Sequence, residues 1–199
     1  LLAGAGTLVA TLVALQTAQT GYNMRHVLGI DLPTPSLAMM DTQEIDFYQE
    51  VTRRVGTLPG VAGVALGSFV PWRDSGPLLP GLKFTAEGYT PVDGEEDPRR
   101  RLRIVAPGFF AVLGVPMLAG RDFTTNDRRD SEPVVIVSQS VARRMFPGGD
   151  AMNRTLWWTD PLFGKPRPRR IVGIVADVDD VNVVSQPDMT IYHPLQQIG

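Results

Sequence analysis

The chain has 199 residues, 43% of them hydrophobic and 20% charged, which is typical of a folded globular protein and not of a disordered one. Its formal net charge of −2 argues against nucleic-acid binding, since proteins that bind nucleic acids usually carry a basic surplus. The absence of cysteine excludes a disulfide scaffold and a cysteine metal site. The length suits one ordinary domain or two small lobes.

The first segment, 1–16, contains no charged residue, and the first charge is at Arg25. It lacks the basic start of a signal peptide, and it is shorter than the roughly 20 residues that span a bilayer. Because apolar residues surround every face of a helix over this segment, we expect the outer end of a transmembrane helix. A buried helix in a soluble core is the alternative.

The next part of the sequence predicts a βαβ unit. Residues 27–32 are predicted as a strand, 41–58 as an amphipathic helix, and 61–70 as an apolar, buried strand. Glu44 follows Asp41 by three residues, as in a capping box. The helix carries one apolar stripe, formed by Ile45, Tyr48, Val51, Val55 and Leu58.

A Pro- and Gly-rich stretch, 71–82, predicts a crossing into a second, β-rich region. Residues 92–101 hold an acidic run and then a basic run around a proline, which favours a solvated loop over a binding patch. Ser138 is expected to cap a helix over 139–146. Further strands are predicted at 83–89, 133–137, 154–158, 170–178 and 190–194.

The stretch 102–124 has almost no charge between Arg103 and Arg121, so most of it should be buried. Its pattern predicts a strand, a short helix that begins near Gly108, a second strand and a turn. Phe110 is expected in the core, and Gly120 is expected to allow a tight turn. No residue in the stretch has the character of a nucleophile, base or metal ligand.

Side chains that could carry chemistry are few. His26 and His193 are far apart and are in no metal-binding spacing, so structural or surface roles are favoured. Ser68 lacks the flanking pattern of a nucleophile elbow. Gly4 and Gly6 lie in the apolar first segment and make no phosphate-binding loop, so the chain is not expected to bind ATP itself.

Two clusters remain as candidates. Asp177, Asp179 and Asp180 follow a strand and could hold a hard cation, but the spacing of an EF-hand is absent and carboxylates that face water are favoured. Trp157, Trp158 and Phe163 form an aromatic cluster near a loop, which would suit a partner surface. Because side chains alternate along a strand, one tryptophan should point inward and the other outward.

Three runs resemble a known family: VAPGFFAVLGVPMLAGRDFT, EPVVIVSQSVARRMFPGGDAMNRTL and RRIVGIVADVDD. Together with the closing IYHPLQQ they look like the periplasmic core domain of MacB-type ABC transporter permeases, also called FtsX-like. Two positions depart from the family pattern. Asn153 replaces a glycine, and Asn tolerates positive φ better than most residues. Ser138-Gln139 replaces Asn-Glu at the expected helix start.

The resemblance implies an α+β fold with two lobes after the end of the first transmembrane helix (1–20). A porter-like βαβ lobe near the membrane would comprise 26–70 and 188–199, and an inserted β-rich lobe with short helices would comprise 80–187. It also implies a domain in the periplasm, attached to the inner membrane, that relays ATP-driven motion and docks partners and is not an enzyme. The implied partners are a second permease half, a cytoplasmic ATPase and a periplasmic adaptor, with no cofactor or metal in this chain.

One alternative stays open. The same apolar segment could tether an extracytoplasmic domain that binds a ligand or protein and has no connection to transport, with the Trp157–Phe163 region as its binding surface. Additional apolar spans after residue 199 would favour the permease.

Overall fold

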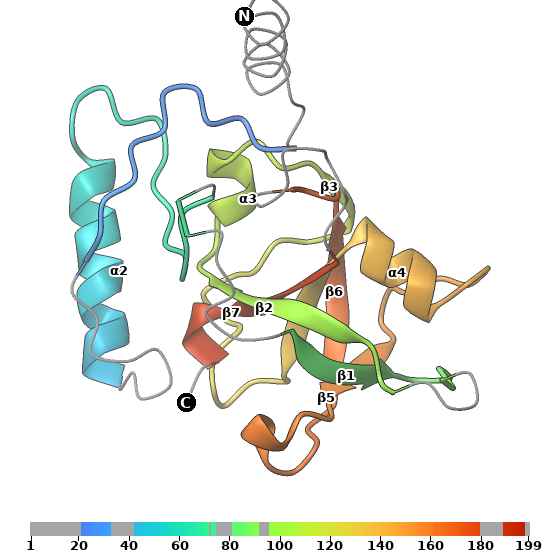
Figure 1. The fold of residues 1–199 in the computed structure, drawn as a ribbon. Coiled ribbons are helices and arrows are strands. Elements are labelled where there is room, and N and C mark those ends of the chain that lie inside the picture. The colour runs from blue at the N-terminus through green and yellow to red at the C-terminus, as the bar shows by residue number, and fades with distance from the viewer. Residues whose placement is uncertain are drawn as a thin grey trace, which may run out of the picture.

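One sheet dominates the structure, a computed structural model that describes residues 21–32, 42–71, 73–74, 81–91, 96–179 and 189–197. It confirms an α+β architecture, with strands in the centre and few helices (Figure 1). The expected membrane helix (1–20), Asp41 and Asp180 lie outside the described residues. In the part of the chain that is described, no helix has the length and apolar character needed to span a membrane.

Helix α2 (Thr42–Gly56) confirms the predicted amphipathic helix. Ile45 and Tyr48 are buried, whereas Leu58, at the other end of the predicted stripe, is 55% exposed. On the outer face, Glu50 accepts hydrogen bonds from Arg53 and Arg54, both with a shortest distance of 2.7 Å. Val51 and Val55 are half-buried, so burial along the stripe decreases toward the end of the helix.

The prediction of two strands beside α2 is wrong. Residues 27–32 form no strand, and 61–70 contain only an isolated bridge between Gly67 and Val105. That bridge rests on two backbone hydrogen bonds, from Ser68 N to Ile104 O (2.8 Å) and from Ala106 N to Leu66 O (2.9 Å). A strand requires a neighbour that completes its ladder, and apolar β-branched residues alone do not supply one.

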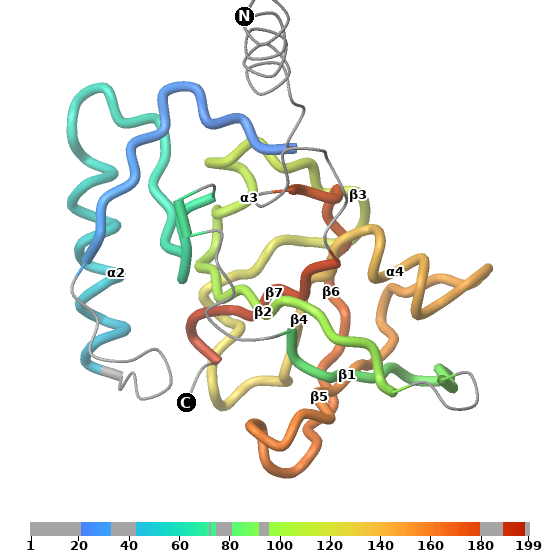
Figure 2. Tube along the Cα trace, viewed as in Figure 1, coloured from blue at the N-terminus to red at the C-terminus, as the bar shows by residue number. Residues whose placement is uncertain are grey.

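The sheet has the strand order β3-β6-β4-β7-β2-β1-β5, and β5 also pairs with β6. Because β5 pairs with β1 on one side and with β6 on the other, the sheet closes into a ring, and β3 extends it beside β6 (Figure 2). Its strands are β1 (Leu82–Ala86), β2 (Arg99–Val105), β3 (Met117–Gly120), β4 (Val134–Ser138), β5 (Thr155–Trp158), β6 (Arg169–Val175) and β7 (Thr190–Pro194).

The basic end of the predicted 92–101 loop is part of the sheet. Arg99 and Arg100 pair with β1, and Arg101 pairs with Thr190 of β7. The prediction of a solvated loop is therefore wrong for 99–101. Alternation along a strand leaves room for arginines because one face of the ladder can reach water.

Strand alternation divides the core between the two faces of the sheet. Val135 and Val137 point into the ring, whereas Val134 and Ile136 point outward. Helix α4 (Gln139–Met145) contributes to the inner cluster, and helix α3 (Phe109–Val112) contributes to the outer one. The inner cluster also contains Leu82, Phe84, Ala86, Leu156, Trp158, Ile171 and Ile191.

A third, smaller cluster attaches α2 to the sheet. Ile45 and Tyr48 pack with Ile104 of β2 and with Leu195, which lies in the 3-10 helix η3 (Leu195–Gln197). Strand β7 directly precedes η3 and lies between β4 and β2, with every residue buried. Residues 190–194, which the sequence analysis grouped with the porter-like lobe, thus belong to the same sheet as strands from 80–187.

The stretch 102–124 is built largely as predicted. It supplies the end of β2, helix α3 and strand β3, and Phe109, Phe110 and Leu113 are buried. Gly120 has φ +76°, and a Cβ there would lie 2.2 Å from the carbonyl oxygen of Val172. Only glycine fits both the backbone angle and the close approach of β6.

The two departures from the family pattern have different outcomes. Asn153 has φ +62°, which confirms that asparagine preserves the turn. Ser138 occupies the N-cap position of α4, but its side chain does not cap the helix. Its Oγ instead accepts a hydrogen bond from Thr190 N at 3.0 Å, so it stabilises the neighbouring strand β7.

Candidate interaction surface

The predicted aromatic cluster divides at β5, as strand alternation requires. Trp158 is 1% exposed and points into the ring, whereas Trp157 is partly exposed on the opposite side of the strand. Phe163 is partly exposed and stacks on Trp158, with ring centroids 5.3 Å apart and planes at 15°. Trp158 is therefore part of the core and is removed from the candidate surface, while a partner at Trp157 or Phe163 stays a prediction.

His193 contacts Trp158 at the indole nitrogen. The two rings stack with centroids 5.8 Å apart, and Trp158 Nε1 donates a hydrogen bond to His193 Nε2 at 3.0 Å. Burial, and to a lesser degree the charge of Arg169, hold the pKa of His193 well below its usual value. A buried, neutral histidine that accepts a hydrogen bond is a structural residue, whereas His26 is exposed in a turn.

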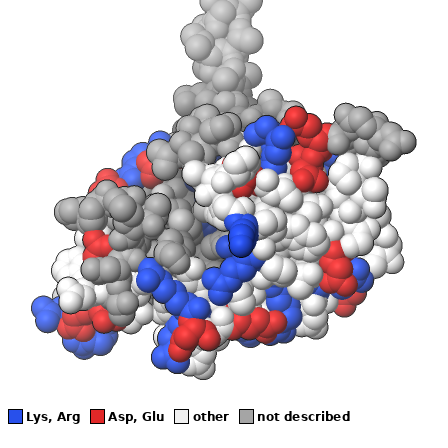
Figure 3. Space-filling view, turned by 90° about the horizontal axis from the view of Figure 1, so that it is seen from below, with Lys and Arg blue, Asp and Glu red and all other residues white. Residues whose placement is uncertain are grey.

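The loop after β5 is fixed to the ring of strands by local contacts. Its 3-10 helix η2 (Pro161–Phe163) is capped by Asp160, whose Oδ1 accepts a hydrogen bond from Leu162 N at 3.1 Å. Asp160 N in turn donates to Lys83 O at 3.2 Å. These contacts give the loop a defined conformation. Figure 3 shows the molecule from below, and on this face Lys and Arg side chains lie near the middle.

Two members of the predicted acidic cluster, Asp177 and Asp179, lie within the described residues, and Asp180 does not. Asp177 Oδ1 accepts a hydrogen bond from Ser140 N at 2.8 Å, so Asp177 supplies the cap that Ser138 does not. Asp179 is buried at 2% exposure. No group of three potential metal ligands occurs within the described ranges.

Ser68 is hydrogen-bonded to the backbone of β2. Its Oγ accepts a hydrogen bond from Ile104 N at 3.1 Å, next to the isolated bridge at Gly67. It thus completes the backbone pairing of β2 at a point where no regular strand lies alongside. This contact supports the structural reading of Ser68.

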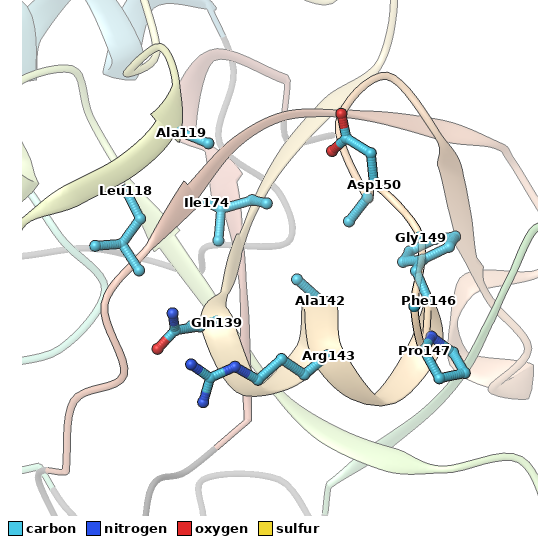
Figure 4. A pocket seen from close by; sticks show the side chains of 12 residues that line it. Leu118, Ala119, Gln139, Ala142, Arg143, Phe146, Pro147, Gly149, Asp150 and Ile174 are labelled. Carbon is cyan, nitrogen blue, oxygen red and sulfur yellow. The ribbon is translucent and has the colours of Figure 1, made fainter.

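An open groove of about 550 Å³ lies between β3 and α4 (Figure 4). Apolar side chains line it from three elements: Leu118 of β3, Ile174 of β6 and Ala142 of α4. Among its polar lining residues are Arg143 and Asp150. Such a lining suits apolar contact with a partner and does not bring together an acid, a base and a nucleophile.

Sequence reasoning missed the ion pair that shapes the turn after β3. The two terminal guanidinium nitrogens of Arg121 each donate to Asp127 at 2.8 Å, and Asp127 is only 5% exposed. Burial alone would raise the pKa of Asp127, but hydrogen bonds from Arg121 and from the Thr124 amide outweigh it and lower the pKa. Next to this pair, burial raises the pKa of Asp122, although its carboxylate accepts hydrogen bonds from the amides of Gly108 and Phe123.

Gln197 was also missed, although it ends the IYHPLQQ run. Its Oε1 accepts a hydrogen bond from Val134 N at 3.0 Å, and its Nε2 donates to Glu132 O at 2.8 Å and to Ser131 Oγ at 3.1 Å. One side chain therefore ties the last described residues to the segment that leads into β4. The pairing spans more than 60 residues, and no local pattern announces it.

A family model described as the MacB-like periplasmic core domain matches residues 4–199. The chain belongs to this family. The resemblance identified from the sequence runs is thereby confirmed, and the chain is a MacB-like periplasmic core domain of an ABC transporter permease.

Curated relatives of this MacB-like domain carry the name macrolide export ATP-binding/permease protein MacB. The one from Neisseria gonorrhoeae is 27% identical over 118 residues, which cover 56% of this chain and 17% of the relative. The one from Mannheimia succiniciproducens is 30% identical over 76 residues, which cover 38% and 11%. The match thus spans a small part of each relative.

Two solved structures resemble the MacB-like domain in fold. The periplasmic region of MacB from Actinobacillus actinomycetemcomitans gives a TM-score of 0.48 at 15% identity and covers 75% of this chain and 56% of that one. The extracellular domain of the noncanonic ABC-type transporter YknZ from Gram-positive bacteria gives 0.43 at 19% identity, with 74% and 62% covered.

Proposed function

We propose that this domain lies outside the inner membrane as part of an ABC permease, where it relays motion driven by ATP hydrolysis in a separate cytoplasmic domain and docks partners. It catalyses no reaction and needs no cofactor of its own. The observation that carries the proposal is the family match over residues 4–199.

The closed sheet supports a mechanical role. A relay has to move as a rigid body, and close-packed cores transmit displacement because they are not continuously deformable. The ring of strands is filled by fully buried side chains such as Phe84, Leu156 and Ile171. A displacement applied at one side of such a body reaches the other side with little loss.

The surface around α2 supports the proposed porter-like lobe. Leu28 is 81% exposed and Ile30 is 66% exposed, two positions apart in the segment that precedes α2. Phe47 and Leu58, at 57% and 55%, add to this apolar surface. We infer that further parts of the permease cover these side chains and complete a lobe made from 26–70 and 188–199.

In this proposal the segment 188–199 connects the two lobes. Its strand β7 belongs to the sheet, while Leu195 of η3 packs with Ile45 and Tyr48 of α2. The inserted lobe of 80–187 then moves together with the α2 layer. The proposal also includes residues 1–20 as the end of a transmembrane helix, a paired permease half, a cytoplasmic ATPase and a periplasmic adaptor.

Single cysteines test both the relay and the lobe, since the chain has none of its own. Leu28→Cys in the complete permease, in membrane vesicles with its ATPase, should react slowly with a maleimide because neighbouring parts cover it. The rate should change by at least threefold between ATP and ATP with vanadate. Thr125→Cys, which is exposed in the turn after β3 and lies outside the groove, is the control and should react at one rate in both states.

Two results would contradict the proposal. Fast, nucleotide-independent labelling at Leu28→Cys would mean that no lobe is completed around α2. Equal labelling changes at both positions would mean that nucleotide acts on the whole domain surface and not through this layer.

A further inference from the structure

The loop from η2 into β6 carries a run of positive charge that the described residues neutralise only in part. Residues 161–176 contain no Asp or Glu but include Lys165, Arg167, Arg169 and Arg170. Arg170 is paired with Glu132, with contacts of 2.8 and 2.6 Å. Among the described residues, no carboxylate lies within ion-pair distance of the other three cations.

The three uncompensated cations alternate with prolines. Lys165, Arg167 and Arg169 are separated by Pro166 and Pro168, and proline restricts the backbone to extended conformations here. Alternate residues of an extended segment lie on the same side, which brings Arg167 and Arg169 together. Consistent with this, Arg169 Nη1 donates to Arg167 O at 2.9 Å.

Arg169 is held where its charge is poorly compensated. It is half-buried at the start of β6, opposite Leu156 of β5, and close enough to His193 to affect that ring. Burial first, and then the neighbouring Arg167, lower the pKa of Arg169 to about 10. A bound anion would stabilise the charged form of Arg169, because it places a negative charge beside a guanidinium that has no carboxylate partner among the described residues.

The loop that presents these cations is preorganised. Phe163 stacks on Trp158, which is itself hydrogen-bonded to His193, and Asp160 caps η2. A segment fixed in this way loses little conformational entropy when it binds. Arginine and aromatic side chains together are also what protein interfaces favour.

We propose that the 161–170 loop binds an acidic segment of a partner protein, with Arg167 and Arg169 receiving its carboxylates and Phe163 contacting an apolar side chain beside them. The choice of a protein over anionic lipid rests on the proposed function. The loop lies at the bottom of Figure 1, whereas the described chain begins at the top, on the side where that function puts the membrane. A partner at this end would be in the periplasm.

Binding of a fluorescein-labelled deca-glutamate peptide tests the site by anisotropy on the whole chain in a non-ionic detergent at low ionic strength. Replacing Lys165, Arg167 and Arg169 by Gln should weaken binding at least tenfold. The control removes the same charge elsewhere, by replacing Arg25, Arg54 and Arg144 with Gln, and should change the dissociation constant by less than twofold. Equal weakening in both variants would overturn the proposal, as would undiminished binding by the loop variant.

A conservative substitution separates a built site from general attraction. Arg169→Lys keeps the charge but loses the planar fork that grips a carboxylate with two hydrogen bonds, and we expect at least threefold weaker binding. No change would show that only net charge matters and would overturn the assignment of Arg169.

Vesicles separate the two sources of anionic groups. The chain should bind phosphatidylglycerol vesicles to the same extent with and without the loop substitutions. Loss of vesicle binding in the loop variant, with no effect on the peptide, would assign the loop to a lipid surface instead. Neither assay involves nucleotide or transport. The proposal of a relay can therefore be refuted without affecting the proposed binding site, and the binding site can be refuted without affecting the relay.

Discussion

Replacing Phe110 by alanine tests whether α3 is part of the hydrophobic cluster on the outer face of the sheet. Phe110 is 2% exposed and meets two other rings edge to face. Tyr192 of β7 lies at a centroid distance of 4.9 Å and an angle of 83°, and Phe109 lies at 5.7 Å and 89°. The substitution therefore removes a side chain that joins α3 to the central strand.

The expected loss in the free energy of unfolding is about 3–5 kcal/mol, the usual range for truncating a buried phenylalanine. Of this, each edge-to-face contact accounts for about 0.5–1.5 kcal/mol beyond area burial. The site cannot collapse easily, because Tyr192 is fixed in the sheet between β4 and β2. In a chain of this size the midpoint of thermal unfolding should fall by about 6–20 °C.

Urea unfolding followed by circular dichroism measures this loss, in a non-ionic detergent that keeps the apolar segment 1–16 in solution. Phe47→Ala is the matched control, because it removes the same ring from a position that is 57% exposed. It should change stability by no more than about 0.5 kcal/mol. A loss below about 1 kcal/mol at Phe110 would mean that α3 is not held by this ring, and the inference of a rigid 102–124 stretch would fall.

Three further perturbations have defined outcomes. Burial lowers the native pKa of His193 but not its pKa in the unfolded chain, so stability should fall by about 1.4 kcal/mol per pH unit as the pH drops below about 6.5. That slope should be reduced in His193→Gln and kept in His26→Asn, as measured by urea unfolding between pH 7 and 5; equal slopes would contradict it. Gly120→Ala should cost several kcal/mol in thermal melts, and Gly148→Ala only about 1, because both have positive φ but only Gly120 would meet the backbone of β6. Gln197→Ala should speed hydrogen exchange at the amides of 131–134 at least tenfold and leave β1 unchanged, whereas uniform acceleration would indicate global destabilisation.

Local composition predicted the buried centre of the fold well. Strands β4 and β6 follow from runs that are apolar on both faces, and these faces do pack into different clusters. Helix α2 follows from its periodicity. The opposite orientations of Trp157 and Trp158 follow from strand alternation alone.

What failed depends on partners that are distant in the chain. Residues 27–32 and 61–70 have strand-like composition, yet no neighbouring strand completes a ladder with them in the described part of the chain. Conversely, the arginines at 99–101 resemble a loop, but β1 and β7 supply the hydrogen bonds that make them a strand. The ion pair of Arg121 with Asp127, in the turn after β3, was also missed because no local pattern fixes the geometry of that turn.

The position of β7 also determines how the domain resists a pull along the chain. The strand lies between an antiparallel neighbour, β4, and a parallel one, β2, so tension along it would shear hydrogen bonds on both sides at the same time. A strand bonded on both sides resists such tension better than an edge strand, whose hydrogen bonds can break one after another. Gln197 also binds the backbone of Glu132 and of Val134, at the start of β4. A pull at the C-terminal side would therefore be shared by β7 and β4.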